Sequence, residues 1–210
     1  MPNNPHKQYF VKYFLIIFLP TICLAGALLL FAFTKEKNHH ITISATEAVS
    51  FLKAEQELVS DIIHSITTDL LTLAGSHEVT MTIKNNTVRN DLLHDLLLFS
   101  QQKRIYDQIR YLDETGQEII RINFNNGESA IVPEENLQNK AARYYFRDTI
   151  RLGKGEIFVS PLDLNIDHGR IEQPLKPIIR FGTPVFDRRG NKRGVLLLNY
   201  FGAELLHVFR

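Results

Sequence analysis

The sequence is poor in the residues that build disulfides and metal clusters. Cys23 is the only cysteine among 210 residues, which excludes an intrachain disulfide and a zinc site built from several cysteines. The formal net charge is only +1, so the excess of positive charge that is typical of a strongly basic nucleic-acid-binding protein is absent. Apolar residues make up 44% of the chain and charged residues 22%, and this composition indicates a folded protein rather than a disordered one.

Motifs of the common catalytic and metal sites are also missing. There is no HExxH zinc motif, no serine or cysteine in a nucleophile elbow, and no glycine-rich loop long enough to bind phosphate. Asp163, Asn165 and Asp167 have the spacing that opens a calcium-binding loop, but its sixth position is His168 instead of glycine and its twelfth is Pro174 instead of glutamate. We therefore expect a protein that is not an enzyme and that holds no metal or cofactor.

Acidic residues are absent from the first 34 positions, which contain two lysines. Within this segment, residues 13–33 are 21 consecutive residues without a charge. As a helix with a rise of ~1.5 Å per residue they would measure roughly 31 Å, which matches the ~30 Å hydrocarbon core of a bilayer. A cleaved signal peptide would have a shorter apolar region of about 7–15 residues. We expect a short tail over residues 1–12 and one transmembrane helix over residues 13–33.

Lysines flank both ends of this expected span, so their count alone does not decide the orientation. Lys7 and Lys12 precede the span, and Lys35 and Lys37 follow it. A tail of twelve residues is too short for a domain, so the folded part follows the span. That part contains no cysteine, which suits an oxidising compartment, and we expect it outside the cytoplasm.

A long amphipathic stalk helix is expected over residues 44–75. Ser44 and Glu47 have the spacing of a capping box, and Gly75 ends the pattern. Between them, one seam recurs at alternating spacings of three and four residues: Val49, Leu52, Gln56, Val59, Ile63, Ile66, Leu70 and Leu73. A seam of nearly four heptads permits a coiled-coil homodimer. Leu58, Ile62 and Leu71 widen the apolar stripe, which equally suits packing of the helix on its own domain, and the two arrangements can coexist along one helix.

The remaining pattern predicts one α+β domain over residues 76–200. A second helix is expected over residues 91–102, with Asn90 as its N-cap, and a third over residues 134–152. Alternation of apolar and polar residues predicts strands over residues 106–112, 117–124, 129–132, 157–162, 177–186 and 195–200. This order indicates an antiparallel sheet with helices on one face.

Several segments together resemble a known family of sensor domains. They are residues 106–116, 118–121, 139–146, 155–165 and 176–187, with Gly190 and residues 194–199. As a set they resemble the Cache family, a PAS-like extracytoplasmic sensor module of bacterial membrane receptors, in its double-module form. The resemblance covers about residues 45–205.

This resemblance implies a single-pass protein of the bacterial inner membrane with its C-terminal domain in the periplasm or outside the cell. It further implies that the stalk helix passes a signal to an output domain, such as a histidine kinase, a cyclic-di-GMP cyclase or a chemotaxis signalling domain. The sequence ends at Arg210, after the membrane-distal module of the family pattern. We therefore expect residues 201–210 to be the start of a truncated connecting helix in the front part of a receptor.

The resemblance also implies a ligand site between the sheet and the third helix. That helix supplies Arg143, Tyr144 and Tyr145, and the sheet supplies Arg180. Arg143 could hold a carboxylate through two parallel hydrogen bonds, and the aromatic rings could form the walls of a pocket. The alternative is that these rings are core packing and that Arg143 pairs with a nearby acid.

Relatives that bind amino acids have an Arg-x-Trp-Tyr element for the carboxylate and a strand-end aspartate for the ammonium. Here Tyr145 and Phe146 replace the Trp and the Tyr, and Asn199 stands at the acidic position. The charge that an ammonium would need is therefore missing, which disfavours an α-amino acid and leaves a carboxylate or another small polar ligand open.

Bases recur at spacings of three and four in the same region: Lys140, Arg143, Arg147, Arg151 and Lys154. On a helix this stripe would either attract an anion or form a solvated face. Two functions remain open from the sequence. The first is a sensor whose partners are a small molecule, the membrane and a second copy of the chain, with no nucleic acid. The second is a structural or dimerisation anchor with a PAS-like fold and no ligand.

Overall fold

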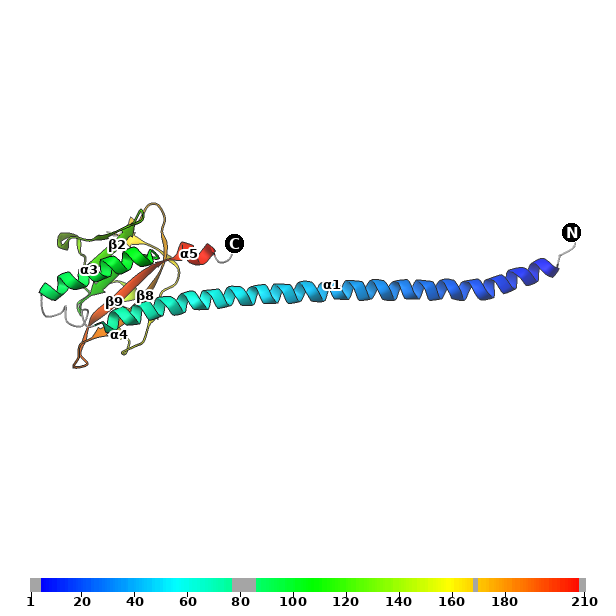
Figure 1. The fold of residues 1–210 in the computed structure, drawn as a ribbon, viewed down its shortest axis with the longest axis horizontal. Coiled ribbons are helices and arrows are strands. Elements are labelled where there is room, and N and C mark those ends of the chain that lie inside the picture. The colour runs from blue at the N-terminus through cyan, green and yellow to red at the C-terminus, as the bar shows by residue number, and fades with distance from the viewer. Residues whose placement is uncertain (1–4, 77–85, 168–169, 208–210) are drawn as a thin grey trace. The chain divides into compact units, whose positions relative to one another are not determined.

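The computed structural model describes residues 5–76, 86–167 and 170–207 (Figure 1). The chain divides into two compact units, Met1–Ala54 and Glu55–Arg210. The first unit is built from helix α1, whose bounds are Pro5–Gly75. The second contains the last turns of α1 and all other elements.

The first unit contains a candidate membrane span. Residues Lys12–Lys35 form 24 helical residues with a mean hydropathy of 2.7, and none of the apolar window within them is buried. Pro20 lies within the helix. This agrees with the expected span over residues 13–33. The expected capping box at Ser44 does not start a new helix, because α1 continues through this position to Gly75.

The second unit is organised around an antiparallel sheet in the order β3-β2-β1-β9-β8-β4, with β5 also paired to β8. Its strands are β1 Tyr106–Leu112, β2 Glu118–Asn125, β3 Glu128–Ile131, β4 Phe158–Val159, β5 Asp163–Leu164, β8 Pro177–Phe186 and β9 Lys192–Phe201. A separate two-stranded ribbon is formed by β6 Ile166–Asp167 and β7 Arg170–Ile171. The α+β fold with an antiparallel sheet is therefore confirmed.

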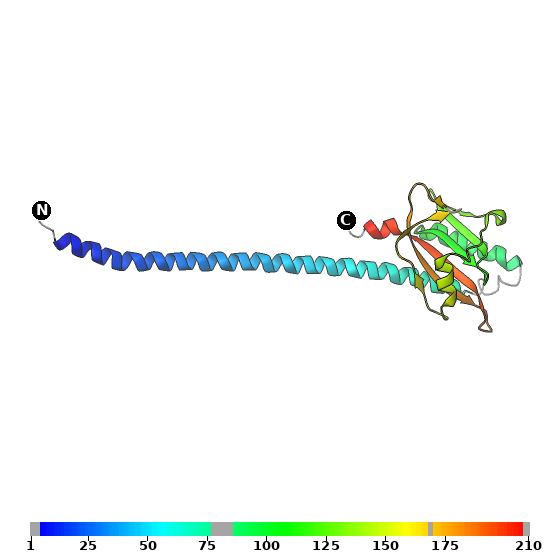
Figure 2. The ribbon, with the colours of Figure 1, turned by 180° about the vertical axis from the view of Figure 1, so that it is seen from behind.

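Helices lie on both faces of this sheet, not on one face as expected. On one face pack the end of α1 and helix α3 (Asn86–Lys103), through the fully buried Ile66, Leu70 and Leu96 (Figure 1). On the other face lies helix α4 (Tyr144–Arg151), seen in the reverse view of Figure 2. A second core cluster, which includes Leu197, packs beneath α4.

The third expected helix, residues 134–152, is only partly formed. Glu134–Asn136 is a short 3-10 helix, η1, and α4 begins eight residues later at Tyr144. The segment between them is attached to the β1–β2 turn, where Lys140 N–H donates to the Gly116 carbonyl at 2.7 Å. Gly116 has a φ of +82° and a Cβ there would lie 2.7 Å from the Ala141 backbone, so this close packing needs glycine. The segment makes this tertiary contact instead of a helical turn.

The bounds of the other helices and strands differ less from those expected from the sequence. Helix α3 begins at Asn86, so Asn90 lies inside the helix and is not its cap. The strand expected over residues 157–162 is reduced to β4, and the helix expected near Phe201 is α5, Gly202–His207. Residues 208–210 lie outside the described part of the chain, as do residues 168–169 of the calcium-loop-like segment.

Candidate functional site

Four polar residues form a row across four neighbouring strands of the sheet, on the face that packs against α4. Arg180 of β8 lies opposite Asn199 of β9, which lies opposite Gln108 of β1, which lies opposite Asn123 of β2. Directly opposed residues of neighbouring strands share a face of the sheet. The face is that of α4, because the Arg180 guanidinium lies 5.0 Å from the centre of the Tyr145 ring. We call these four residues the polar row.

Three of the four residues of the polar row are buried although they are charged or amides, and Asn123 is half-buried. Arg180 is 1% exposed and Asn199 is not exposed at all. Asn199 Nδ2 donates to Gln108 Oε1 at 3.0 Å, and Gln108 Oε1 also accepts from Arg110. Asn199 Oδ1 and Arg180 Nε have no hydrogen-bond partner among the described residues. A buried polar atom without a partner costs about 1–3 kcal/mol, so a group that formed hydrogen bonds with these two atoms would stabilise the domain.

Helix α4 brings its aromatic residues onto the polar row. Tyr145 is buried, and its hydroxyl accepts from Arg110 Nη1 at 3.2 Å. Tyr144 lies edge-on to Tyr145, with ring centres 5.6 Å apart, and its hydroxyl accepts from Arg180 Nη1 at 3.4 Å. Arg143 immediately precedes the helix, and its guanidinium lies 5.8 Å from the Tyr145 ring centre. The structure thus groups Tyr144, Tyr145 and Arg180, and Arg143 approaches this group through the ring of Tyr145.

Arg110 is a second buried guanidinium at this site and was not predicted from the sequence. Arg110 is 2% exposed, and its Nε lies 3.6 Å from a carboxylate oxygen of the equally buried Glu118. Arg110 and Gln108 lie two residues apart on β1, so they face the same side of the sheet. Polar residues at alternate positions of an otherwise apolar strand were the sequence signal that could have revealed them.

Arg180 has a weaker partner than Arg110. Its Nη1 lies 3.3 Å from Asp163 Oδ2, and the Tyr144 hydroxyl lies 3.4 Å from the same oxygen. The Asp163 side chain is 39% exposed, so solvent competes for this carboxylate. A carboxylate at the start of β5, in the segment between β4 and β8, therefore already lies where the two donors converge.

The same segment is attached to the sheet by a second ion pair. Lys176 Nζ lies 3.2 Å from Asp107 Oδ1 and 2.6 Å from Glu172 Oε1. Asn165 Nδ2 donates to Glu172 at 2.7 Å and to Asp107 at 3.3 Å. Burial raises the pKa of the Asp107 carboxyl above its ordinary value, and the charge of Lys176 opposes this shift. These contacts hold the segment between β4 and β8 against the edge of the site.

No cluster of three or more metal-ligating side chains occurs among the described residues. The basic stripe is also not continuous on one helix, because Lys140 precedes α4 and is buried. Arg147 and Arg151 lie on the exposed side of α4, where they form a solvated face.

The family model of the sensor domain of bacterial histidine kinases matches residues 39–206, well over half of the chain. The chain belongs to this family of sensor domains. Its solved structural neighbours include Cache-type sensor domains, which confirms the expected resemblance. No curated protein matches the chain.

Three solved structures illustrate the likeness. The extracellular domain of a protein described as a histidine kinase, vpHK1S-Z8, is 25% identical with a TM-score of 0.69, over 77% of this chain and 58% of that one. The ligand-binding domain of the Campylobacter jejuni chemoreceptor Tlp3, in complex with L-valine, is 13% identical with a TM-score of 0.57, over 76% and 60%. The sensor domain of the Vibrio cholerae histidine kinase DctB is 14% identical with a TM-score of 0.57, over 79% and 58%.

The last two likenesses, at such low identity, show the fold alone. This sensor-domain chain spans about three fifths of the length of each of these solved domains.

Proposed function

We propose that this sensor domain binds a small carboxylate between the sheet and α4, and that binding is signalled across the membrane. The proposal rests on the buried pair of Arg180 and Asn199, whose Nε and Oδ1 atoms have no hydrogen-bond partner among the described residues. A ligand that accepts from the guanidinium and donates to the amide oxygen would satisfy both atoms. A carboxylate that carries a hydroxyl group has this combination.

The ligand carboxylate would take the place of the Asp163 carboxylate. Asp163 now accepts from Arg180 Nη1 and lies near the Tyr144 hydroxyl, at distances of 3.3 and 3.4 Å, which are long for bonds to a charged group. A ligand could approach Arg180 more closely and through two oxygens. Tyr144 and Tyr145 would form the wall of the site, and Arg143 would contribute positive charge at its edge.

Asn199 supports a ligand without an α-ammonium group. The Tlp3 domain has been solved in complex with amino acids such as L-valine. Here the residue at the centre of the polar row is an amide, and its Nδ2 is bonded to Gln108. An amide oxygen stabilises an ammonium less than a carboxylate does, because it has no net charge.

Membership of the family supports a proposal for the remaining organisation. We propose that residues 13–33 anchor the chain in the bacterial inner membrane, that residues 44–75 form the stalk, and that residues 76–200 form the sensor module in the periplasm. Val49 and Leu52 are exposed, whereas Ile66 and Leu70 are buried in the domain core. A homodimer would therefore use the earlier part of the seam. The output would be a histidine kinase, a cyclic-di-GMP cyclase or a chemotaxis domain.

The test is thermal unfolding of the full chain in lipid nanodiscs with a panel of acetate, succinate, malate and citrate. A ligand at 100 times its Kd should stabilise the fold by about 2.7 kcal/mol. Arg180→Gln should abolish the effect, and Arg147→Gln, an equal charge change on the exposed side of α4, should retain it.

Asn199→Asp provides a second test that does not remove a buried cation. It should weaken the response to the carboxylates, since it adds a negative charge beside Arg180, and should favour α-amino acids such as L-valine. The proposal fails if none of the four carboxylates shifts the unfolding of the wild type, or if Arg180→Gln responds as the wild type does.

A further inference from the structure

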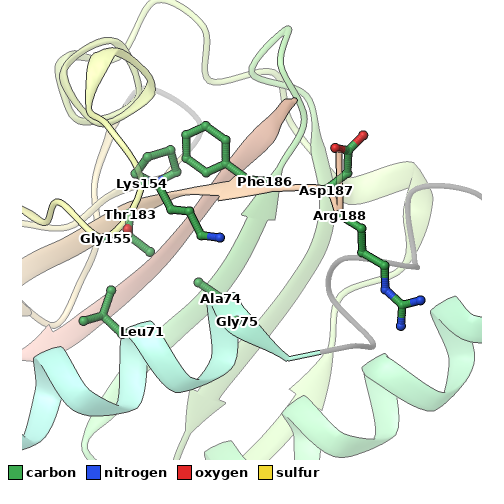
Figure 3. A pocket seen from close by; sticks show the side chains of 10 residues that line it. Leu71, Ala74, Gly75, Lys154, Gly155, Thr183, Phe186, Asp187 and Arg188 are labelled. Atoms are coloured by element: carbon green, nitrogen blue, oxygen red, sulfur yellow. The ribbon is translucent and has the colours of Figure 1, made fainter. Parts of the chain in front are cut away.

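A hollow lies in the second unit, Glu55–Arg210, at the end of α1, and none of its lining residues belongs to the polar row. Its volume is about 420 Å³, within the range of small-molecule pockets. Leu71, Ala74 and Gly75 of α1 line one side, Lys154 follows α4, and Phe186 and Arg188 come from the end of β8 and the following turn (Figure 3). We call this space the α1–β8 hollow.

The lining of the α1–β8 hollow is largely apolar, and the edge of β8 beside it does not suit the addition of a further β-strand. Leu71, Ala74, Pro184 and Phe186 contribute apolar side chains. Here β8 has passed its last pairing with β4, which ends at Gly182, so its outer edge is unpaired in the described parts of the chain. Pro184 has no N–H to offer at this edge, which disfavours the addition of a strand. A compact molecule fits the hollow better than an extended peptide.

Two glycines leave room in the wall. A Cβ built at Gly75 or at Gly155 meets no atom within 4 Å. Gly155 has a φ of +81°, a backbone conformation that favours glycine. Gly75 does not have a positive φ. Space at Gly75 can therefore be filled by substitution without backbone strain.

Positive charge dominates the rim. Lys154 and Arg188 are exposed, and neither has an ion-pair partner among the residues that the structure describes. Figure 3 shows Lys154 on one side of the hollow and Arg188 on the other. Lys192 does not line the hollow: its Nζ lies 5.6 Å from the centre of the Phe186 ring and donates to the carbonyls of Ile150 and Leu152.

The one acid in the lining does not offset this charge. The Asp187 carboxylate accepts from the backbone N–H groups of Asn191 and Arg189 at 2.9 Å each. It also forms an ion pair with Arg193 at 2.9 Å. These bonds hold the pKa of Asp187 far below its ordinary value, and the bond from the Asn191 backbone N–H has the largest effect. The carboxylate is therefore ionised, and its charge is already neutralised by Arg193.

We propose that the α1–β8 hollow binds a small amphipathic anion, that is, an aromatic or short aliphatic body with one carboxylate. The body would lie against Leu71, Ala74 and Phe186, and the carboxylate would lie at the rim near Lys154 or Arg188. This site is separate from the polar row, and its ligand would contact the last turn of α1 directly. It therefore adds a second input to the helix that leads to the membrane.

The experiment is calorimetric titration of the full chain in nanodiscs with 2-naphthoate, with empty nanodiscs subtracted. The alcohol 2-naphthalenemethanol has the same apolar body without the charge. We expect 2-naphthoate to bind and the alcohol to bind more weakly. Gly75→Leu should abolish binding by filling the hollow, and circular dichroism should show that the fold is retained.

Variants that remove charge at the rim give a second, independent test of the proposal. Lys154→Gln with Arg188→Gln should weaken 2-naphthoate binding by about threefold to tenfold, as expected for exposed charges. Arg147→Gln with Arg151→Gln removes the same charge outside the hollow and should leave binding unchanged. The proposal is overturned if 2-naphthoate does not bind, if Gly75→Leu binds it as the wild type does, or if the alcohol binds equally well.

Loss of binding in Arg180→Gln would also overturn it, because the probe would then occupy the polar row. Failure of the carboxylate panel at the polar row leaves the α1–β8 hollow untouched. The two proposals can therefore fail separately.

Discussion

Tyr106 and Asp107 are consecutive in β1, and their side chains make contacts on opposite sides of the sheet. The Tyr106 hydroxyl donates to Asp69 of α1 at 2.6 Å, and the Asp107 carboxylate accepts from Lys176 at 3.2 Å beside the polar row. The pairing of β1 with β9 shifts its register between Tyr106 and Gln108, which places the extra residue Asp107 in a bulge. One peptide bond therefore links the edge of the candidate ligand site to α1, the helix that contains the candidate membrane span.

Tyr106→Phe should destabilise the domain. The substitution removes a hydrogen bond to a charged acceptor, and such bonds contribute about 1.5–3 kcal/mol. Tyr111→Phe is the matched control, because the Tyr111 hydroxyl donates to a neutral carbonyl, that of Arg193. It should cost about 0.5–1.5 kcal/mol. Urea denaturation measures both, and an equal or smaller loss for Tyr106→Phe would contradict the importance of the Asp69 contact.

Leu70→Ala and Leu71→Ala should differ sharply although the residues are neighbours on α1. Leu70 is fully buried against the sheet, whereas Leu71 is 39% exposed. Leu70→Ala should lower the free energy of unfolding by about 2–5 kcal/mol, because it leaves a cavity in the core. Leu71→Ala should change it by about 0.5 kcal/mol or less. Similar losses in the two variants would show that the end of α1 packs on the sheet by another face.

Asp187 should make the domain sensitive to acid. Its pKa in the folded state is held below the ordinary value of 3.8, so the folded state binds fewer protons than the unfolded state in this range. The stabilisation is present above about pH 4 and is lost as the pH falls toward the folded-state pKa. The difference in unfolding free energy between the wild type and Asp187→Ala should therefore shrink below about pH 4. A difference that stays constant with pH in urea titrations would refute this assignment.

Asp163→Asn should tighten carboxylate binding at the polar row. The substitution removes the acid that now lies 3.3 Å from Arg180, so a ligand no longer competes with it. We expect a decrease in the apparent Kd of whichever carboxylate of the panel binds, measured by calorimetry. Asp148→Asn, an exposed acid on α4, is the control and should leave the Kd unchanged. Weaker binding in Asp163→Asn would mean that Asp163 contacts the ligand favourably.

Much of the sheet was predictable because its signals are local. Strand β8 has the predicted bounds, Pro177–Phe186, and strand β1 has the predicted bounds, Tyr106–Leu112. The turn between β1 and β2 forms where the sequence predicts it, because the Asp113 side chain accepts the N–H groups of Thr115 and Gln117. These features depend on residues that are close in the sequence.

The candidate site was predictable only in part. Tyr144, Tyr145, Arg180 and Asn199 lie on the same face of the sheet, and their roles in ligand binding stay predictions. Gln108, Arg110 and Asp163 were not recognised. The helix expected over residues 134–152 is only partly formed, because the contact between Lys140 and Gly116 takes the place of helical turns between η1 and α4. Nothing in the sequence around Lys140 or Gly116 indicates that these two residues are in contact.

The sequence alone determined the apolar segment, the turns, most strands and the family, since each depends on composition or on short-range periodicity. Only the tertiary structure decided which part of the α1 seam is buried and which polar residues share the row under α4. Arg180 and Gln108 lie far apart in the chain, and both are aligned with Asn199 by the hydrogen-bond register of three strands. A shift of one residue in that register would turn a whole row of side chains to the other face, so the site exists only once the sheet has formed.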